Sequence, residues 1–212
     1  MAEEGFDGLS SRWEFWIKES RKIFLVGAFV YIILFGSRFL YQEYYSPVQL
    51  KIGAKYMLGI GVPKDPAIAA QWFRKAADLG NPDGQNMLGT LYLEGNGVPQ
   101  DYAEAAKWFR KAAEKGLPEA QNNLGILFGK GTGVPQDYIE AAKWFREAAE
   151  HGNPRAQMNL GALYANGHGR IQDWQEAYFW ISLSGLDEKE VAYAVKHLTP
   201  EQRKTADKRL EN

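Results

Sequence analysis

The sequence contains no cysteine. This absence excludes disulfides, thiolate metal sites and thiol nucleophiles, and it leaves open whether the protein resides in an oxidising or a reducing compartment. Histidine is also scarce, since only His151, His168 and His197 occur and they are scattered. The formal net charge is −1, so the chain has no basic excess with which to neutralise nucleic-acid phosphates. We therefore predict no cofactor, no metal site, no small-molecule substrate and no nucleic-acid partner.

A hydrophobic segment lies near the N-terminus of this 212-residue chain. Residues 23–37 (IFLVGAFVYIILFGS) carry no charge, but a membrane-spanning helix usually needs about 20 apolar residues and this run is shorter. If the long side chain of Arg38 extends to the membrane surface, the segment continues to Tyr41 and rises by about 28 Å as a helix, which is enough to cross. The sequence thus predicts one transmembrane helix over residues 23–41 and a linker over residues 42–47.

Residues 1–22 have the composition of a segment that lies on a membrane surface. Trp13 and Trp16 stand where an interfacial aromatic belt would lie, and basic residues are interspersed: Arg12, Lys18, Arg21 and Lys22. Because such a basic end stays in the cytoplasm, the rest of the chain is expected across the cytoplasmic (inner) membrane, which in a bacterium is the periplasm. The alternative is a cleaved signal peptide, but cleavage needs a small residue where Leu34 or Phe35 stands, so an uncleaved anchor is preferred.

The remainder of the chain is repetitive. Four residue types recur every 36 positions, and a fixed period of this length indicates stacked units that bury their apolar faces only against their neighbours. The recurring sets are Trp72, Trp108, Trp144 and Trp180; Gln49, Gln85, Gln121 and Gln157; Gly53, Gly89, Gly125 and Gly161; and Asp65, Asp101, Asp137 and Asp173. Four repeats are predicted over residues 48–185. Residues 186–212 follow as two capping helices, of which the second begins at Thr199.

Each repeat is predicted to contain two helices. Residues at i, i+3, i+4 and i+7 form a packing stripe over 85–92 in the first helix and over 105–112 in the second. Asp101, with Glu104 three residues later, is typical of a capping box at the start of the second helix. Gly116 stands where that helix would end in a left-handed residue, and a proline two positions later opens the next helix.

The repeated pattern, AQ-x-x-LG-x-x-Y-x-x-G-x-GV-x-x-D-x-x-x-A-x-x-WF-x-x-AA-x-x-G, resembles the Sel-1-like repeat, a relative of the tetratricopeptide repeat with a longer loop between its helices. The match extends over residues 48–185 and is most regular over residues 84–155. The resemblance implies an all-α fold, a right-handed α-solenoid of four helix-pair repeats whose curved surface binds other proteins, often as an adaptor or assembly factor in envelope or membrane complexes. It supplies no catalytic residues.

Candidate binding residues vary between repeats and are expected to face outward beside the packing stripe of the first helices. In a tetratricopeptide-like stack they would line the concave face. They are Asn86, Thr90, Asn122, Asn123, Ile126, Met158 and Asn159. A surface that is rich in asparagine and weakly charged favours recognition of a protein backbone or loop over a strongly charged ligand. Trp13, Trp16 and Arg38 are the candidate membrane contacts.

The sequence therefore predicts a protein-interaction scaffold rather than an enzyme. It would be an accessory subunit or assembly factor that is held by one helix in the cytoplasmic membrane, with its repeats in the periplasm, and that docks onto an integral membrane complex. The alternative is a periplasmic binder of envelope polysaccharide or peptidoglycan. That function would require exposed aromatic rings along the concave face, whereas most aromatic residues fall on the packing stripes.

Overall fold

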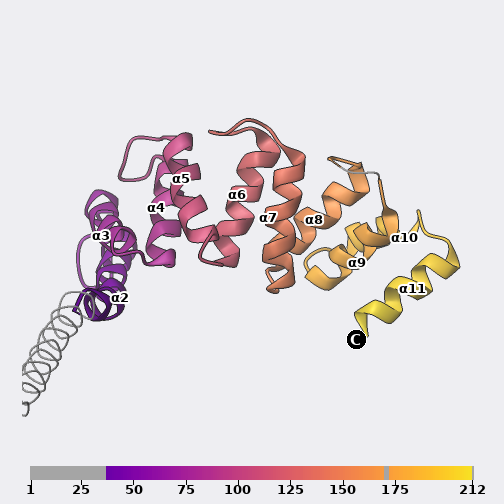
Figure 1. The fold of residues 1–212 in the computed structure, drawn as a ribbon, viewed down its shortest axis with the longest axis horizontal. Helices are drawn as coiled ribbons and strands as arrows, with labels where there is room; N and C mark the ends of the chain where they lie inside the picture. Colours follow the sequence, from indigo (N-terminus) through magenta and orange to yellow (C-terminus); the bar gives the residue numbers. More distant parts are fainter. Residues whose placement is uncertain (1–36, 170–171, 212) are drawn as a thin grey trace, which may run out of the picture. The chain divides into compact units, whose positions relative to one another are not determined.

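The computed structural model describes residues 37–169 and 172–211, which form ten helices (Figure 1). They are α2 (Ser37–Leu58), α3 (Pro66–Asp78), α4 (Pro82–Glu94), α5 (Tyr102–Ala113), α6 (Pro118–Lys130), α7 (Tyr138–Glu150), α8 (Pro154–Asn166), α9 (Trp174–Ser184), α10 (Glu188–Val195) and α11 (Pro200–Leu210). No strand occurs in the two described ranges. The predicted all-α fold is confirmed for this part of the chain.

Helix α2 leads into the first repeat. Trp13, Trp16 and most of the predicted transmembrane helix over residues 23–41 lie outside the described residues, whereas Arg38 belongs to α2. The segment expected to be a linker, residues 42–47, is helical and belongs to α2. It contains no glycine, and its single proline removes only one backbone N–H donor from the helix. None of the helices in the described ranges is long and apolar enough to cross a membrane.

The repeats belong to a unit that runs from Ser46 to the C-terminus. First helices (α2, α4, α6 and α8) alternate with second helices (α3, α5, α7 and α9), so the four predicted helix pairs are present. From α3 to α9 each helix packs against the next one. A Cβ atom at Gly89 would lie 2.8 Å from Phe109 Cδ1, and one at Gly125 would lie 2.7 Å from Phe145 Cδ1. Glycine recurs at this position because the phenylalanine of the second helix needs that space.

The repeated aspartates cap the second helices, but not by the predicted capping box. Asp137 Oδ1 accepts hydrogen bonds from the backbone amides of Ile139 and Glu140 at 2.8 and 3.0 Å. The backbone N–H of Asp137 donates at 2.9 Å to the carbonyl oxygen of Phe128, in the first helix of the same repeat. Corresponding backbone bonds are made by Asp65, Asp101 and Asp173. The aspartate thus caps one helix and ties it to the other.

The repeated glutamines join each repeat to the preceding one. Their side-chain Nε2 atoms donate to backbone carbonyls in the last turn of the preceding second helix, where carbonyls lack partners inside the helix. The pairs are Gln85 with Ala77, Gln121 with Ala113 and Gln157 with Ala149, at 3.1 to 3.3 Å. All three glutamines are buried, so these bonds offset part of the cost of removing an amide from water.

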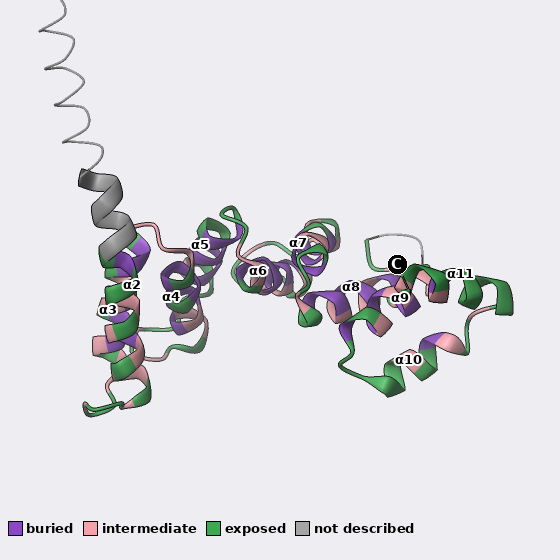
Figure 2. Cartoon of the chain, turned by 90° about the horizontal axis from the view of Figure 1, so that it is seen from below, coloured by how far each residue is buried: buried purple, intermediate pink, exposed green. Residues whose placement is uncertain are grey.

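The array ends in α10 and α11. Each contributes one buried residue, Ala194 and Ala206 respectively. Helix α11 begins with the predicted Thr199 cap, extended to a complete capping box, because Gln202 N donates to Thr199 Oγ1 at 3.2 Å and Thr199 N donates to Gln202 Oε1 at 2.9 Å. Figure 2 shows both helices largely exposed, whereas α4 to α9 carry broad buried faces. A helix pair that packs on one side only is suited to end the stack.

Candidate partner-binding surface

The predicted asparagine surface is partly a buried hydrogen-bond array. Asn86 and Asn122 are 8% and 4% exposed, so the prediction that they face outward is wrong. Asn123 Nδ2 donates to Asn86 Oδ1 at 3.1 Å, and Asn159 Nδ2 donates to Asn122 Oδ1 at 2.9 Å. Each pair joins the first helices of consecutive repeats. Helical periodicity could not reveal this, because a position beside the packing stripe faces either solvent or the neighbouring repeat.

The other candidate residues have mixed roles. Thr90 Oγ1 donates to the backbone carbonyl of Asn86 at 3.1 Å, within α4. Ile126 and Met158 are half-buried and pack against the main hydrophobic core. Met158 also lines a groove at the end of the array, so the structure connects one predicted residue with a cavity.

This groove is lined by residues of α8, α9 and α10 and has a volume of about 780 Å³. Pockets of roughly 300 to 1,000 Å³ are the usual size of ligand sites. The side chains that matter for its chemistry are Met158 and Ala162 from α8, Trp174 and Ile181 from α9, and Glu190 and Tyr193 from α10. We call it the α8–α10 groove. We call its apolar lining residues Met158, Ala162 and Ile181 the floor, and α10 contributes the acidic Glu190.

An aromatic cluster stands at one side of the α8–α10 groove. The rings of Trp174 and His197 stack with centroids 3.9 Å apart and an interplanar angle of 11°. Tyr193 meets Trp174 edge to face at 5.7 Å and is itself 52% exposed. The stacked His197 ring supports the Trp174 ring from one side, while Tyr193 presents its ring to solvent.

The position of Trp174 explains why sequence analysis overlooked the cluster. In earlier repeats, a glycine from the inter-helix loop of the next repeat packs against the first residue of the second helix. For example, a Cβ atom at Gly133 would be 2.3 Å from the backbone carbon of Tyr102, the first residue of α5. Trp174 is the first residue of α9, so it occupies the same position in the fourth repeat. No such glycine loop follows α10, and the His197 ring stacks on the Trp174 ring instead. The available signal was this departure from the repeat after Gly185.

The terminal helix is held by polar contacts with α9. Tyr178 donates its hydroxyl to Asp207 Oδ1 at 2.5 Å, and Arg209 donates to Glu176 Oε1 at 2.5 Å. The Arg209 guanidinium also lies 3.9 Å from the ring centroid of Phe179. Burial, followed by the hydrogen bond to Asp207, raises the pKa of the Tyr178 hydroxyl above the usual range of tyrosine.

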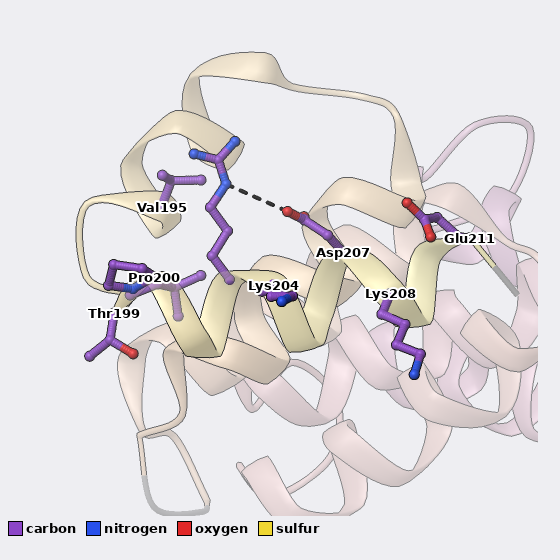
Figure 3. Close-up of a pocket in the computed structure, with 9 residues that line it drawn as sticks. Val195, Thr199, Pro200, Lys204, Asp207, Lys208 and Glu211 are labelled. Carbon is purple, nitrogen blue, oxygen red and sulfur yellow. Dashed lines mark ion pairs between the residues drawn. The ribbon is translucent and has the colours of Figure 1, made fainter.

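A second cavity, of about 700 Å³, lies along α11 (Figure 3). Val195, Leu198 and Pro200 supply its apolar part. Of its two lining carboxylates, Asp207 is already engaged, because Arg203 Nε lies 3.7 Å from it and Tyr178 donates a hydrogen bond to it. The dashed line in Figure 3 marks this ion pair, and the lining residues come from the end of α10, from α11 and from the residues directly beside these helices.

The described residues show little of the chemistry expected of a catalytic centre. No group of three or more His, Asp or Glu side chains able to hold a metal ion occurs in residues 37–169 and 172–211. A hydrogen bond from Lys107 to Glu104, at 2.5 Å, raises the pKa of the lysine, and the pair is exposed on α5. The shifted pKa values of Lys107 and Tyr178 therefore have structural causes away from the α8–α10 groove.

Comparisons with known proteins agree with this architecture. The Sel1 repeat profile matches residues 46–81, 82–117, 118–153 and 154–185. The structure of c5321, a protective antigen of uropathogenic Escherichia coli strains displaying an SLR fold, matches with 41% identity and a TM-score of 0.66, over 68% of this chain and 31% of that one. A Sel1 repeat protein from Oxalobacter formigenes matches with 38% identity and a TM-score of 0.64, over 69% and 60% respectively. The match thus covers less than two thirds of either relative, and a comparison with curated proteins gave no match.

Proposed function

The chain belongs to the Sel1 repeat family, and we propose that it is a membrane-anchored scaffold that docks from the periplasmic side onto an integral membrane complex, as an accessory subunit or assembly factor. Sel1-like repeats generally mediate protein–protein interactions, and Sel1 repeat proteins are generally non-enzymatic scaffolds. The observation that carries the proposal is the α8–α10 groove, where an exposed tyrosine ring and an apolar floor adjoin acidic side chains. A surface of this composition is better suited to binding a segment of another protein than to catalysing a reaction.

The anchor in this proposal is the hydrophobic segment over residues 23–41, with Trp13 and Trp16 at the cytoplasmic interface. An anchor raises the local concentration of the repeats near a membrane-bound partner, so a modest interface suffices for stable association. Arg38 would lie near the outer end of the segment, where an ionisable side chain either reaches the interface or pairs with an acidic group of the partner.

Localisation can be tested by membrane flotation of the full chain and of a variant that lacks residues 23–37. The full chain is expected to float with the inner-membrane fraction, and the deletion variant is expected in the soluble fraction. Protease added to spheroplasts should degrade the repeats of the full chain if they face the periplasm. Protection from the protease in intact spheroplasts would overturn the periplasmic assignment.

The partner can be tested by affinity capture of the full chain from native membranes in mild detergent, with chemical cross-linking and mass spectrometry. We expect one stoichiometric membrane complex, with cross-links from Lys189 of α10 or from Lys196, which follows α10 as its C-cap. A Glu190→Arg variant should capture less of it. Absence of any co-purifying membrane protein would contradict the scaffold proposal.

Binding of envelope polysaccharide or peptidoglycan is the alternative function. It would need a row of exposed rings, but Trp108, Trp144 and Trp180 are at most 7% exposed. Trp174 and Tyr193 form a single aromatic site, which is short for a glycan chain. Calorimetric titration of the full chain with soluble peptidoglycan fragments tests this alternative directly, and no heat of binding is expected.

A further inference from the structure

The α8–α10 groove opens where the asparagine pairing between repeats stops. In the two preceding junctions, Asn86 and Asn122 accept a hydrogen bond from an asparagine of the next first helix. Met158 follows them at the same position of the repeat, and its thioether is only a weak acceptor. Tyr193 is the sixth residue of α10, as Asn159 is of α8. Without an asparagine pair to close this junction, apolar surface remains accessible.

Two side-chain amides beside the α8–α10 groove are partly engaged within the chain. Asn166 Nδ2 donates to the carbonyl of Ala162 at 2.9 Å, and Gln172 Nε2 donates to the carbonyl of Ala165 at 2.6 Å. Each bond uses one of the two N–H donors of its amide, and neither engages the amide oxygen. The amide oxygens can therefore accept hydrogen bonds from donors of an occupant.

The charged side chains that line the groove, among the described residues, have one sign. Asp187 and Glu190 line it, and no Lys, Arg or His is among the described lining residues. Within residues 37–169 and 172–211, no ion pair joins either carboxylate to a cation. Asp187 already caps α10, since it accepts the backbone amide of Lys189 at 2.9 Å, whereas Glu190 is exposed. Glu190 is thus the carboxylate most available to a bound cation.

We propose that the α8–α10 groove binds an extended segment of a protein partner in which a Lys or Arg side chain stands next to an apolar one. The cation would lie between Glu190 and the Tyr193 ring, where carboxylate and aromatic face both attract it. The apolar side chain would occupy the floor formed by Met158, Ala162 and Ile181. This inference rests on the proposed function and specifies the chemistry of the partner.

The test uses the full chain in detergent micelles and a phage library of random heptapeptides as the probe. Selected peptides are expected to be enriched in Lys or Arg adjacent to Leu, Ile, Phe or Met. A selected peptide, synthesised and titrated by fluorescence anisotropy, should bind Glu190→Arg at least about tenfold more weakly and should lose affinity as salt is raised. Tyr193→Ala should also weaken binding.

The matched control is Glu188→Arg, which makes the same charge change in the first turn of α10 at an exposed residue outside the groove. Equal weakening by the two arginine variants would overturn the proposal, because it would reflect net charge alone. Selection of no peptide, or of peptides without basic enrichment, would overturn it too. If the capture experiment still yields a membrane partner in that case, the scaffold proposal stands and only the groove chemistry fails. Binding of soluble peptidoglycan fragments in competition with the peptide would assign the groove to glycan instead.

Discussion

Asn159 donates its side-chain amide to Asn122 Oδ1 at 2.9 Å, and this bond links α8 to α6 across a repeat junction. Asn122 is only 4% exposed. Water therefore cannot take the place of its side chain unless the junction between the two repeats opens locally. The same arrangement recurs one repeat earlier between Asn123 and Asn86. The asparagines therefore belong to the packing of the stack, and the proposed binding surface lies at the junction that lacks them.

Replacing Asn122 by alanine should lower the free energy of unfolding by about 1–3 kcal/mol, because the buried Asn122 side chain is removed and the half-buried Asn159 loses its hydrogen-bond partner. Urea unfolding followed by circular dichroism measures this change. A double-mutant cycle with Asn159→Ala should give a coupling energy of roughly 0.5–1.5 kcal/mol. Strict additivity of the two substitutions would contradict a direct bond.

Glycines with positive φ differ in how much space surrounds them. Gly133 and Gly116 have φ of +72° and +81°, but a Cβ atom at Gly133 would lie 2.3 Å from the Tyr102 backbone, whereas one at Gly116 would meet nothing within 4 Å. Gly116→Ala should cost roughly 1–2 kcal/mol from backbone strain alone. Gly133→Ala should cost at least about 1 kcal/mol more, since packing strain is added. Thermal unfolding of the two variants in parallel makes the comparison, and equal costs would argue against the close approach.

Periodicity predicted the helices well because the forces that form them are local or repeat at fixed spacing. The aspartate caps, the left-handed glycines and the small residues of the packing stripes act within one or two helices. The bond from the Asp137 amide to Phe128, by contrast, depends on how two helices meet, and no spacing rule identifies it. Residues 42–47 were expected to form a linker because they follow the predicted transmembrane helix and precede the first repeat, whereas the structure continues α2 through them and through Pro47.

The hydroxyl of Tyr178 has a pKa above the usual range, mainly because it is buried and also because it donates to Asp207. Since the folded-state pKa exceeds that of the unfolded chain, the contribution of Tyr178 to stability is complete below the ordinary tyrosine pKa of about 10 and is lost as pH rises through the folded value. The unaltered chain should therefore lose stability above about pH 10 more steeply than Tyr178→Phe. Urea unfolding at a series of alkaline pH values tests this, and parallel curves would refute the assignment.

Arg209 holds α11 to α9 by its bond with Glu176 and its contact with Phe179. Arg209→Ala should accelerate hydrogen exchange of the α11 amides, with a change in global stability of no more than about 1 kcal/mol because the pair is partly exposed. Lys204→Ala is the control, since Lys204 is exposed on the same helix and removal of its charge leaves the contacts of Arg209 in place. Equal acceleration by both substitutions would contradict the role assigned to Arg209.

The candidate site was less predictable than the fold. Sequence variation among the first helices pointed to Met158, but it also pointed to Asn86 and Asn122, whose environment depends on the neighbouring repeat. The aromatic pair of Trp174 and Tyr193 falls where the repeat pattern ends, so no comparison between repeats could identify it. The α8–α10 groove forms where the repeat pattern stops, so it can be recognised only once the positions of α8 and α10 are known.

The most direct test of the account is site-specific photo-cross-linking in cells of the native host, with the benzophenone amino acid p-benzoylphenylalanine in place of Tyr193. The matched control places it at Ile139, which is 64% exposed on α7 and distant from the α8–α10 groove in sequence. We predict one dominant protein adduct from position 193, of an integral membrane protein, that disappears when Glu190→Arg is introduced into the same chain. An equal adduct from position 139, or no adduct from position 193, would contradict the claim that this protein is a scaffold that binds its partner through the groove.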